Sequence, residues 1–219
     1  MTTRAVCLDV MGTLFDLSAV RRRLDGLGAP PATFEAWFGR LLHTAASVTL
    51  IDDYRPFPEL AKPALESVLA QLDLDPDGAG EVLGALAELD AYADAAPALE
   101  RLASAGLRVV ALTNGTEQNT HTLLERSGLD RHVERVLPTD AVGVYKPHPA
   151  VYGHAVEQLA VPAEDVTLIA AHGWDVMGAR AAGLRAVWVS RLERRWPLPP
   201  PEPPTAADLM GAADRTLAG

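Results

Sequence analysis

The first part of the chain combines one strand-like run with a long helical pattern. Residues 4–8 form a short apolar run that ends at Asp9, which predicts a buried strand, and Gly12-Thr13 is a turn signal. No strand pattern then appears until about residue 89. Apolar residues instead recur at helical spacing in 17–27, 32–48, 58–72 and 79–91. The pattern therefore predicts an all-helical block that is inserted early in the chain.

After Asp94 the pattern changes to alternating strands and helices. The predicted strands span 107–112, 133–137, 166–171 and 185–189, and the predicted helices span 96–105, 117–127, 149–159 and 175–182. Repeated strand–helix units predict an α/β fold with a parallel, doubly wound sheet that carries helices on both faces. Six prolines within 196–204 predict an extended surface segment that leads to a terminal helix over 207–217.

Polar side chains with catalytic potential follow four of the predicted strands. Because ligands bind beyond the carboxyl ends of the strands in an open parallel sheet, these side chains are expected to meet at one edge. They are Asp9 after the first strand, Thr113 and Asn114 after the second, Lys146 in the loop after the third, and His172, Trp174 and Asp175 after the fourth. Each has a simple structural explanation when taken alone, such as a helix N-cap for Asp175. Their convergence predicts an active site.

Composition narrows the functional classes. Of 219 residues, 48% are hydrophobic, which suits a globular protein with a substantial core. The net charge of −10 argues against partners such as nucleic acid or a membrane surface, and no apolar run reaches membrane-spanning length. The single Cys7 excludes an internal disulfide and residues 1–8 are too short for a signal peptide, so a cytoplasmic location is expected. There are two lysines, Lys62 and Lys146, against seventeen arginines, which draws attention to Lys146.

Four segments of the chain resemble the motifs of the haloacid dehalogenase superfamily, and they occur in the order found in that family. The segments are Cys7–Asp16, Val109–Gly115, Gly143–Pro147 and Ala171–Asp175 followed by Gly178-Ala179. The resemblance covers residues 5 to about 191. It implies a Rossmann-like core formed by residues 1–16 and 94–219, with a helical cap at 17–93 inserted after the first strand.

Two positions separate the chain from the phosphatases of this superfamily. Phosphatases carry a second aspartate two residues after the nucleophile and an acidic pair for Mg²⁺ in the fourth motif. The chain has Met11 and Ala171 at these places, and Met11 has no proton to give to a leaving group. Trp174, Asp175 and the Gly178-Ala179 pair instead resemble the 2-haloacid dehalogenase branch, which implies a reaction that needs no metal and no cofactor.

The resemblance to that branch implies a two-step hydrolysis through an aspartyl ester. Asp9 would attack C2 of a short 2-haloalkanoate and displace the halide, while Lys146 keeps the Asp9 carboxylate ionised. Asp175 or His172 would then activate the water that hydrolyses the ester to a 2-hydroxy acid. The branch carries Ser and Asn where this chain has Ala170 and His172, so His172 is expected to replace the asparagine.

The other site residues are assigned to the small anionic substrate and the departing halide. Thr113 Oγ1 and backbone N–H groups near Met11, Gly12 and Asn114 would hold the carboxylate of the haloacid. Arg40 lies at the place of the cap arginine that grips the halogen in this branch, and Asn114 would assist it. The residues that complete the implied pocket are Thr13, Tyr152 and Trp174.

Three other functions stay open at this point. A phosphatase with an altered metal site would still use Asp9 as its nucleophile. A phosphonate hydrolase would need a cap lysine, for which Lys62 is the sole candidate. A non-catalytic binding protein of the same fold would be expected to lack Asp9 or Lys146, and both are present. The resemblance also suggests a homodimer as the candidate assembly, with the helical cap as its interface.

Overall fold

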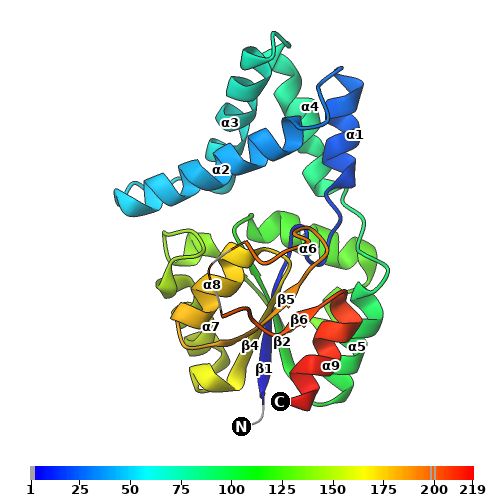
Figure 1. Ribbon diagram of the computed structural model, residues 1–219, viewed down its shortest axis with the longest axis vertical. Helices are drawn as coiled ribbons and strands as arrows, with labels where there is room; N and C mark the ends of the chain where they lie inside the picture. Colours follow the sequence, from blue (N-terminus) through cyan, green and yellow to red (C-terminus); the bar gives the residue numbers. More distant parts are fainter. Residues whose placement is uncertain (1–2, 198, 200) are drawn as a thin grey trace.

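The structure of the protein is a computed structural model that describes residues 3–197, 199 and 201–219. Within these residues, parallel strands form a six-stranded sheet in the order β3-β2-β1-β4-β5-β6 (Figure 1). The strands are β1 Ala5–Asp9, β2 Arg108–Thr113, β3 Arg135–Pro138, β4 Val166–Ala170, β5 Arg185–Val189 and β6 Thr205–Ala206. The predicted α/β class is confirmed. The sequence pattern missed β6, because a two-residue strand directly after prolines leaves no alternation to recognise.

Strand β1 lies inside the sheet, and all five of its residues are buried. Because alternate residues point to opposite faces, Val6 and Leu8 join one apolar cluster while Ala5 and Cys7 join the other. Helices cover both faces, as the doubly wound pattern predicts. The first face carries α5 Ala95–Ser104, α6 Glu117–Ser127 and α9 Leu209–Ala218, and the second carries α7 Pro149–Leu159 and α8 Gly173–Ala181.

A block of helices between β1 and α5 stands beyond one edge of the sheet-bearing part (Figure 1). Its helices are α1 Ser18–Gly26, α2 Thr33–Leu50, α3 Phe57–Gln71 and α4 Ala79–Gly84. Trp37 of α2 is buried, and its Nε1–H donates to Ala61 O of α3 at 3.0 Å. The helix predicted over 79–91 is shorter than expected. It ends at Gly84 and continues as a 3₁₀ turn at Ala85–Ala87, because the chain then returns to the sheet.

Among the described residues, hydrogen bonds connect the helical block to the sheet-bearing part at three places, one of them on α6, where Asn119 Nδ2 donates to Leu86 O at 3.0 Å. Where the chain crosses between them, Asp16 N–H donates to Asp90 O at 2.9 Å, so the two crossings lie side by side. At the far end of α2, Tyr145 O–H donates to Arg55 O at 2.7 Å. The block is therefore held over the carboxyl ends of the strands from both sides.

The remaining segments are short connections, a surface tip and the C-terminal part. Further 3₁₀ turns lie at Pro76–Gly78, Asp130–His132, Thr139–Ala141 and Ala163–Asp165.

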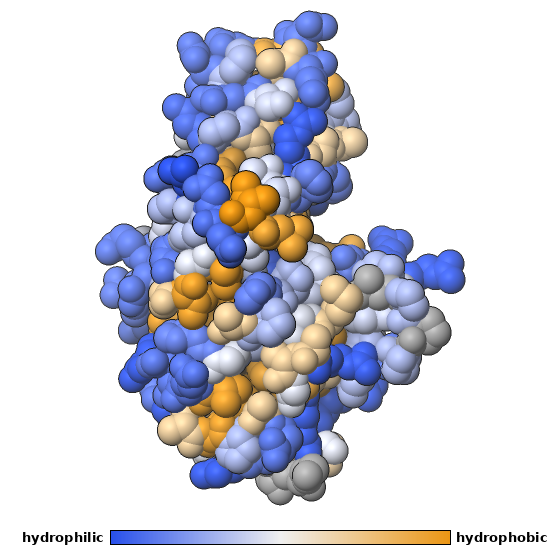
Figure 2. Space-filling model, turned by 90° about the vertical axis from the view of Figure 1, so that its left-hand side faces the viewer, coloured by the Kyte–Doolittle hydropathy of each residue, from blue (hydrophilic) through white to orange (hydrophobic). Residues whose placement is uncertain are grey.

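Figure 2 looks at the side on which α2 ends and shows hydrophobic side chains there. Leu50 and Ile51 at this tip are 83% and 69% exposed. The extended segment predicted over 196–204 includes positions 198 and 200, which lie outside the described residues. Across the described residues, no helix has both the length and the apolar character needed to cross a membrane.

Candidate active site

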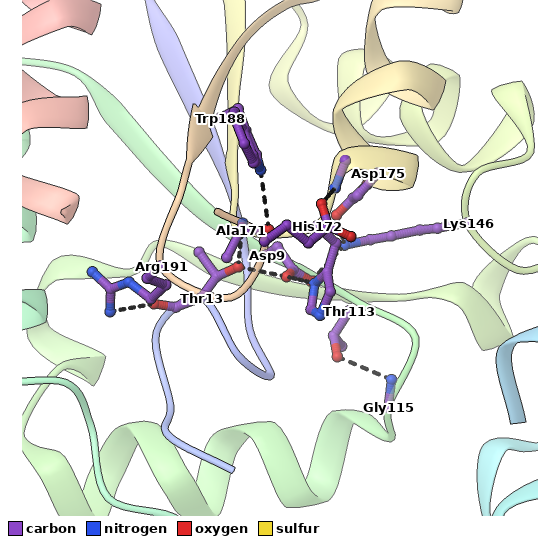
Figure 3. A network of polar contacts seen from close by, with 12 residues as sticks. Asp9, Thr13, Thr113, Gly115, Lys146, Ala171, His172, Asp175, Trp188 and Arg191 are labelled. Atoms are coloured by element: carbon purple, nitrogen blue, oxygen red, sulfur yellow. Dashed lines mark hydrogen bonds and ion pairs between the residues drawn. The ribbon is translucent and has the colours of Figure 1, made fainter. Parts of the chain in front are cut away.

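The polar residues that follow four strands converge at the carboxyl edge of the sheet, below the helical block. Asp9 ends β1 and Thr113 ends β2, while His172 and Asp175 lie at the start of α8. Lys146 comes from the loop before α7, and its side chain reaches across to Asp9 and Asp175 (Figure 3). The convergence that the sequence predicted is therefore present, because β1, β2 and β4 are neighbours in the sheet.

Both oxygens of the Asp9 carboxylate accept hydrogen bonds. Lys146 Nζ donates to Oδ1 at 3.0 Å, whereas Oδ2 lies 2.6 Å from Thr13 Oγ1 and 3.0 Å from His172 Nδ1. Burial alone would raise the pKa of Asp9, but the Lys146 charge and the contacts of His172 and Thr13 outweigh burial and hold this pKa well below its usual range. Asp9 is thus a carboxylate, 6% exposed, at the edge of a cavity.

Asp175 is a different kind of carboxyl group, although it shares the same lysine. Lys146 Nζ donates to its Oδ2 at 2.8 Å and Tyr152 O–H donates to its Oδ1 at 2.6 Å. Burial raises the pKa of Asp175, and the nearby Asp9 charge adds to this rise, although Lys146 and Tyr152 oppose it. The residue is fully buried and does not line the cavity beside Asp9.

The pair of carboxylates does not fit a Mg²⁺ site. Each oxygen of Asp9 and Asp175 is already bound by a donor of the protein, and the ammonium of Lys146 lies between the two side chains. A hard cation needs free oxygen ligands at close range. Over the range that the structure describes, no three His, Cys, Asp or Glu side chains are grouped to hold a metal ion.

The imidazole ring of His172 contacts two aromatic rings, one from the core and one from the helical block. Its ring centroid is 5.1 Å from Trp174 and 5.7 Å from Phe38. Nδ1 faces Asp9, whereas Nε2 is buried without a hydrogen-bond partner among the described residues. Gly12 packs against the ring with a φ of +78°, and a Cβ at this position would lie 3.1 Å from His172 Cε1. The close approach of the turn explains the glycine.

A cavity of about 30 Å³ borders Asp9. The core side of its wall includes Thr113, whose Oγ1 accepts from Gly115 N–H at 3.0 Å, and Asn114, whose Oδ1 accepts from Lys146 N–H at 3.1 Å. The residues that line it are Asp9, Met11, Thr113, Asn114, Gly115, His172 and Trp174 from the core, and Phe38, Leu42 and Phe57 from the helical block. The structure thus brings six of the twelve predicted site residues to one cavity.

The structure contradicts the predicted contact between Arg40 and the halide. Arg40 Nη1 donates to Ser67 Oγ at 2.6 Å and Nη2 donates to Gln71 Oε1 at 2.8 Å, both on α3, and Arg40 does not line the cavity. Phe38 faces Asp9's cavity instead. Successive residues of a helix are about 100° apart, so two residues two positions apart point to nearly opposite sides. Phe38, two positions before Arg40, therefore points into the cavity while Arg40 points away from it.

Tyr152 was also assigned to the substrate pocket, and its position differs from this expectation. Its side chain is fully buried, does not line the cavity, and binds Asp175 from behind. Tyr152 therefore positions Asp175. Thr13 likewise lies under Asp9 and does not line the cavity, because its hydroxyl is held between Ala171 N–H and Asp9 Oδ2.

Four cavity residues were missed by the sequence interpretation, namely Gly115 from the core and Phe38, Leu42 and Phe57 from the helical block. Phe38 and Leu42 are four residues apart and so lie on one side of α2. The side of α2 that carries Trp37 and Leu41 is buried. The apolar residues Phe38 and Leu42, which lie beside this buried side, could have been recognised in the sequence. A second apolar strip on a helix indicates that the helix packs against a second part of the protein.

Comparisons with known proteins agree with this geometry. A family model described as haloacid dehalogenase-like hydrolase matches residues 3–183. The chain belongs to the haloacid dehalogenase-like hydrolase family. Among curated relatives, the (S)-2-haloacid dehalogenase 4A of Burkholderia cepacia is 36% identical to this hydrolase over 193 residues, which cover 86% of this chain and 83% of the relative.

Solved structures of dehalogenases share the fold of this haloacid dehalogenase-like hydrolase over nearly its whole length. One, a dehalogenase in an intermediate complex, is 33% identical with a TM-score of 0.88, and covers 99% of this chain and 98% of the other. Another is the L-2-haloacid dehalogenase of Xanthobacter autotrophicus with chloropropionic acid covalently bound. It is 25% identical with a TM-score of 0.86, and covers 97% of this chain and 98% of the other.

Proposed function

We propose that this protein hydrolyses short 2-haloalkanoic acids to 2-hydroxy acids through an ester formed on Asp9. The observation that carries the proposal is an ionised carboxylate at the edge of a small cavity, held by an ammonium and two further donors. One relative is by its description an (S)-2-haloacid dehalogenase, and one related structure is an L-2-haloacid dehalogenase that holds chloropropionic acid covalently. These findings support the same chemistry here.

In the first step Asp9 attacks C2 of the substrate and the carbon–halogen bond breaks, with its electron pair leaving on the halide. Halide is a stable anion and needs no general acid, so Met11 at the position of the second phosphatase aspartate is no obstacle. Thr113, Met11 and Asn114 line the cavity, and the Oγ1 of the first with the backbone N–H groups of the other two are proposed to receive the substrate carboxylate. The small cavity favours substrates with short chains.

We further propose that residues 17–93 act as a cap on a core formed by residues 1–16 and 94–219. The cap side of the cavity is apolar, and Phe38, Leu42 and Phe57 exclude water from the reacting carbon. A cavity of about 30 Å³ is too small for a haloacid to enter from solution without movement of the cap. The exposed Leu50 and Ile51 at the tip of the cap support a homodimer, and the single cysteine supports a cytoplasmic location.

The reaction is proposed to need no metal, because the oxygens of Asp9 and Asp175 are occupied by donors of the protein. The test measures halide release from (S)- and (R)-2-chloropropionate and phosphate release from p-nitrophenyl phosphate, each with EDTA and with Mg²⁺. We expect halide release that EDTA does not change and little phosphate release. Loss of turnover in EDTA, or faster hydrolysis of the phosphate ester, would instead favour a phosphatase; binding without turnover would favour a non-catalytic protein.

A further inference from the structure

Two larger clefts between the cap and the core flank the small cavity at Asp9. The first, which we call the apolar cleft, has a volume of about 350 Å³ and shares Met11 and Phe57 with the cavity. The second, which we call the acidic cleft, has a volume of about 320 Å³. It shares with the cavity Phe38, Leu42, His172 and Trp174. Among the described residues the two clefts have no lining residue in common, so a small molecule can approach Asp9 from two sides.

The walls that separate the two clefts from the cavity differ in how firmly they are packed. Toward the acidic cleft, the ring centroid of His172 lies 5.7 Å from that of Phe38 and 5.1 Å from that of Trp174. Nδ1 of the same imidazole lies 3.0 Å from an oxygen of the proposed nucleophile. Toward the apolar cleft the wall consists of Met11 and Phe57, which are half-buried. A methionine side chain has three rotatable bonds, so this wall opens without breaking a contact of the nucleophile.

The apolar cleft carries a single positive charge. Among the described residues that line it, Lys62 of α3 is the one with a charged side chain, and this side chain is 58% exposed. Its Nζ lies 3.7 Å from Glu66 Oε1, and Glu66 does not line the cleft. An anion that arrives from solution is therefore attracted to the mouth of this cleft.

The acidic cleft has the opposite character. Its charged lining residues in the described part of the chain are Asp16, Arg21, Glu35 and Glu193. Arg21 Nη1 lies 2.6 Å from Glu35 Oε1, so the charge of the guanidinium is already paired. The remaining carboxylates repel an anion from this side.

We propose that a 2-haloacid anion reaches Asp9 through the apolar cleft, past the side chains of Met11 and Phe57, and not through the acidic cleft. This inference rests on the proposed function. Lys62 attracts the carboxylate of the substrate at the mouth, and the apolar lining receives the carbon–halogen end. Lys62 thus selects for anionic substrates without touching the reacting atoms.

A pair of helical glycines provides matched variants that narrow one cleft each. Gly84 at the end of α4 lines the apolar cleft, and Gly39 of α2 lines the acidic cleft. A Cβ at either position would meet open space, with no neighbouring heavy atom within 4 Å. Gly84→Phe and Gly39→Phe are therefore expected to fold, because phenylalanine is also a better helix former than glycine. Gly84→Ala and Gly39→Ala are the small controls.

Rapid-quench measurement of halide release from (S)-2-chloropropionate separates approach from chemistry. Gly84→Phe should lower kcat/KM on the order of tenfold, because association rates of related variants differ by about one to three decades. The rate of the halide burst at saturating substrate should stay within about twofold of the wild type, as for a change away from the reacting atoms. Gly39→Phe and both alanine variants should match the wild type in both measurements.

The charge of Lys62 gives an independent test of the route. Lys62→Glu reverses the charge at the mouth of the apolar cleft, so kcat/KM should fall about fivefold at low ionic strength. The difference should disappear in roughly 1 M salt, where the Debye length is about 3 Å. Glu35→Gln on the acidic cleft is the matched control, because the Glu35 side chain is 59% exposed. It should leave kcat/KM within about twofold of the wild type.

Three results would overturn the proposal. A loss of kcat/KM in Gly39→Phe without one in Gly84→Phe would place the route in the acidic cleft. Equal losses in both variants, or no loss in either, would show that the cap lifts as a whole. A loss in Lys62→Glu that persists in high salt would show that Lys62 acts through the packing of the cap and not through its charge.

Binding of propionate, which has no leaving group, separates this proposal from the proposed function. Stopped-flow tryptophan fluorescence, with Trp174 on the cavity wall as the reporter, follows its association with the wild type and the two phenylalanine variants. Gly84→Phe should slow association and dissociation by the same factor and leave Kd unchanged. If the wild type releases no halide while this holds, the proposed function fails and the route stands. If halide is released and propionate enters every variant at the wild-type rate, the route fails and the proposed function stands.

Discussion

The core wall and the cap wall of the cavity differ in what they contribute. The core wall carries Asp9, Asn114 and His172, whose polar atoms are held by hydrogen bonds to one another or to Lys146. The cap wall consists of Phe38, Leu42 and Phe57, whose side chains contain no polar atoms. A change in the core wall should therefore alter the reaction, whereas a change in the cap wall should alter which molecules fit and how well water is excluded.

The largest effect is expected for Asp9→Asn, which removes the nucleophile of the core wall. Halide release should fall roughly 10⁴- to 10⁶-fold, the loss seen when a covalent nucleophile is removed, while the protein stays folded because Lys146 keeps its ion pair with Asp175. Wild-type turnover in H₂¹⁸O should also place ¹⁸O in the carboxylate of Asp9. Product that carries all the label after a single turnover would contradict the ester.

Lys146→Met tests the stability of the core wall. It leaves Asp9 and Asp175 as buried carboxyl groups without a cation, which is expected to cost about 3–5 kcal/mol of unfolding free energy. Urea unfolding measures this cost, with Lys62→Met on the cap surface as the control. The pKa of Asp9 is lower in the folded than in the unfolded protein, so its contribution to stability is present above pH ~4 and lost as the pH falls. The variant should lose this acid-side dependence.

Phe38→Ala opens the cap wall without touching the reacting groups. KM for (S)-2-chloropropionate should rise about tenfold, because lost contact with an aromatic ring costs roughly 1–2 kcal/mol. The value of kcat should fall less than KM rises. Phe38→Leu, which keeps most of the apolar surface, is the matched variant. A kcat loss as large as that of Asp9→Asn would show that the cap wall takes part in the chemistry.

Tyr152→Phe removes one hydrogen bond behind the core wall. The unfolding free energy should fall by about 1 kcal/mol, because Asp175 Oδ1 loses its donor while the ring still fills the same space. Halide release should fall by less in Tyr152→Phe than in Lys146→Met, because only the lysine variant removes a hydrogen-bond donor of Asp9. An unchanged melting temperature would contradict the positioning role of Tyr152.

The smallest effect is expected for Arg40→Ala. Its guanidinium binds Ser67 and Gln71 on the outside of the cap, so kcat/KM for halide release should stay within about twofold of the wild type, as for ordinary surface changes. Chloride and bromide substrates should respond alike. A loss near 10²-fold would restore Arg40 as a halide contact and require a different cap orientation during turnover.

The sequence predicted the core wall well because strand ends define it. In a parallel sheet the carboxyl ends of neighbouring strands meet at one edge, so Asp9, Thr113 and His172 could be brought together without knowing any packing detail. The cap wall could not be predicted in the same way. A helix presents a different direction at each residue, and the side of α2 that faces the core depends on how the whole cap sits, which separates Phe38 from Arg40.

The sequence also did not predict how deeply two of the site residues are buried. Tyr152 and Asp175 match the family motif, but only the structure shows that both are fully enclosed and that each binds the other. Asp175 was predicted as a helix N-cap or as a base. It is not a helix N-cap, because α8 begins at Gly173 and the carboxylate turns inward to Lys146, whereas its assignment as the base stays a prediction.

Cys7 lies two residues before Asp9 on the same side of β1, because alternate residues of a strand share a face. A 2-haloacid is an electrophile that alkylates thiolates far more readily than carboxylates. Burial raises the pKa of the Cys7 thiol to about 12, and its exposed surface is 0%. The thiolate that would be alkylated is therefore absent at neutral pH. Strand β1 therefore presents the oxygen nucleophile at its end and buries the one thiol of the chain, so the proposed substrate does not react with that thiol.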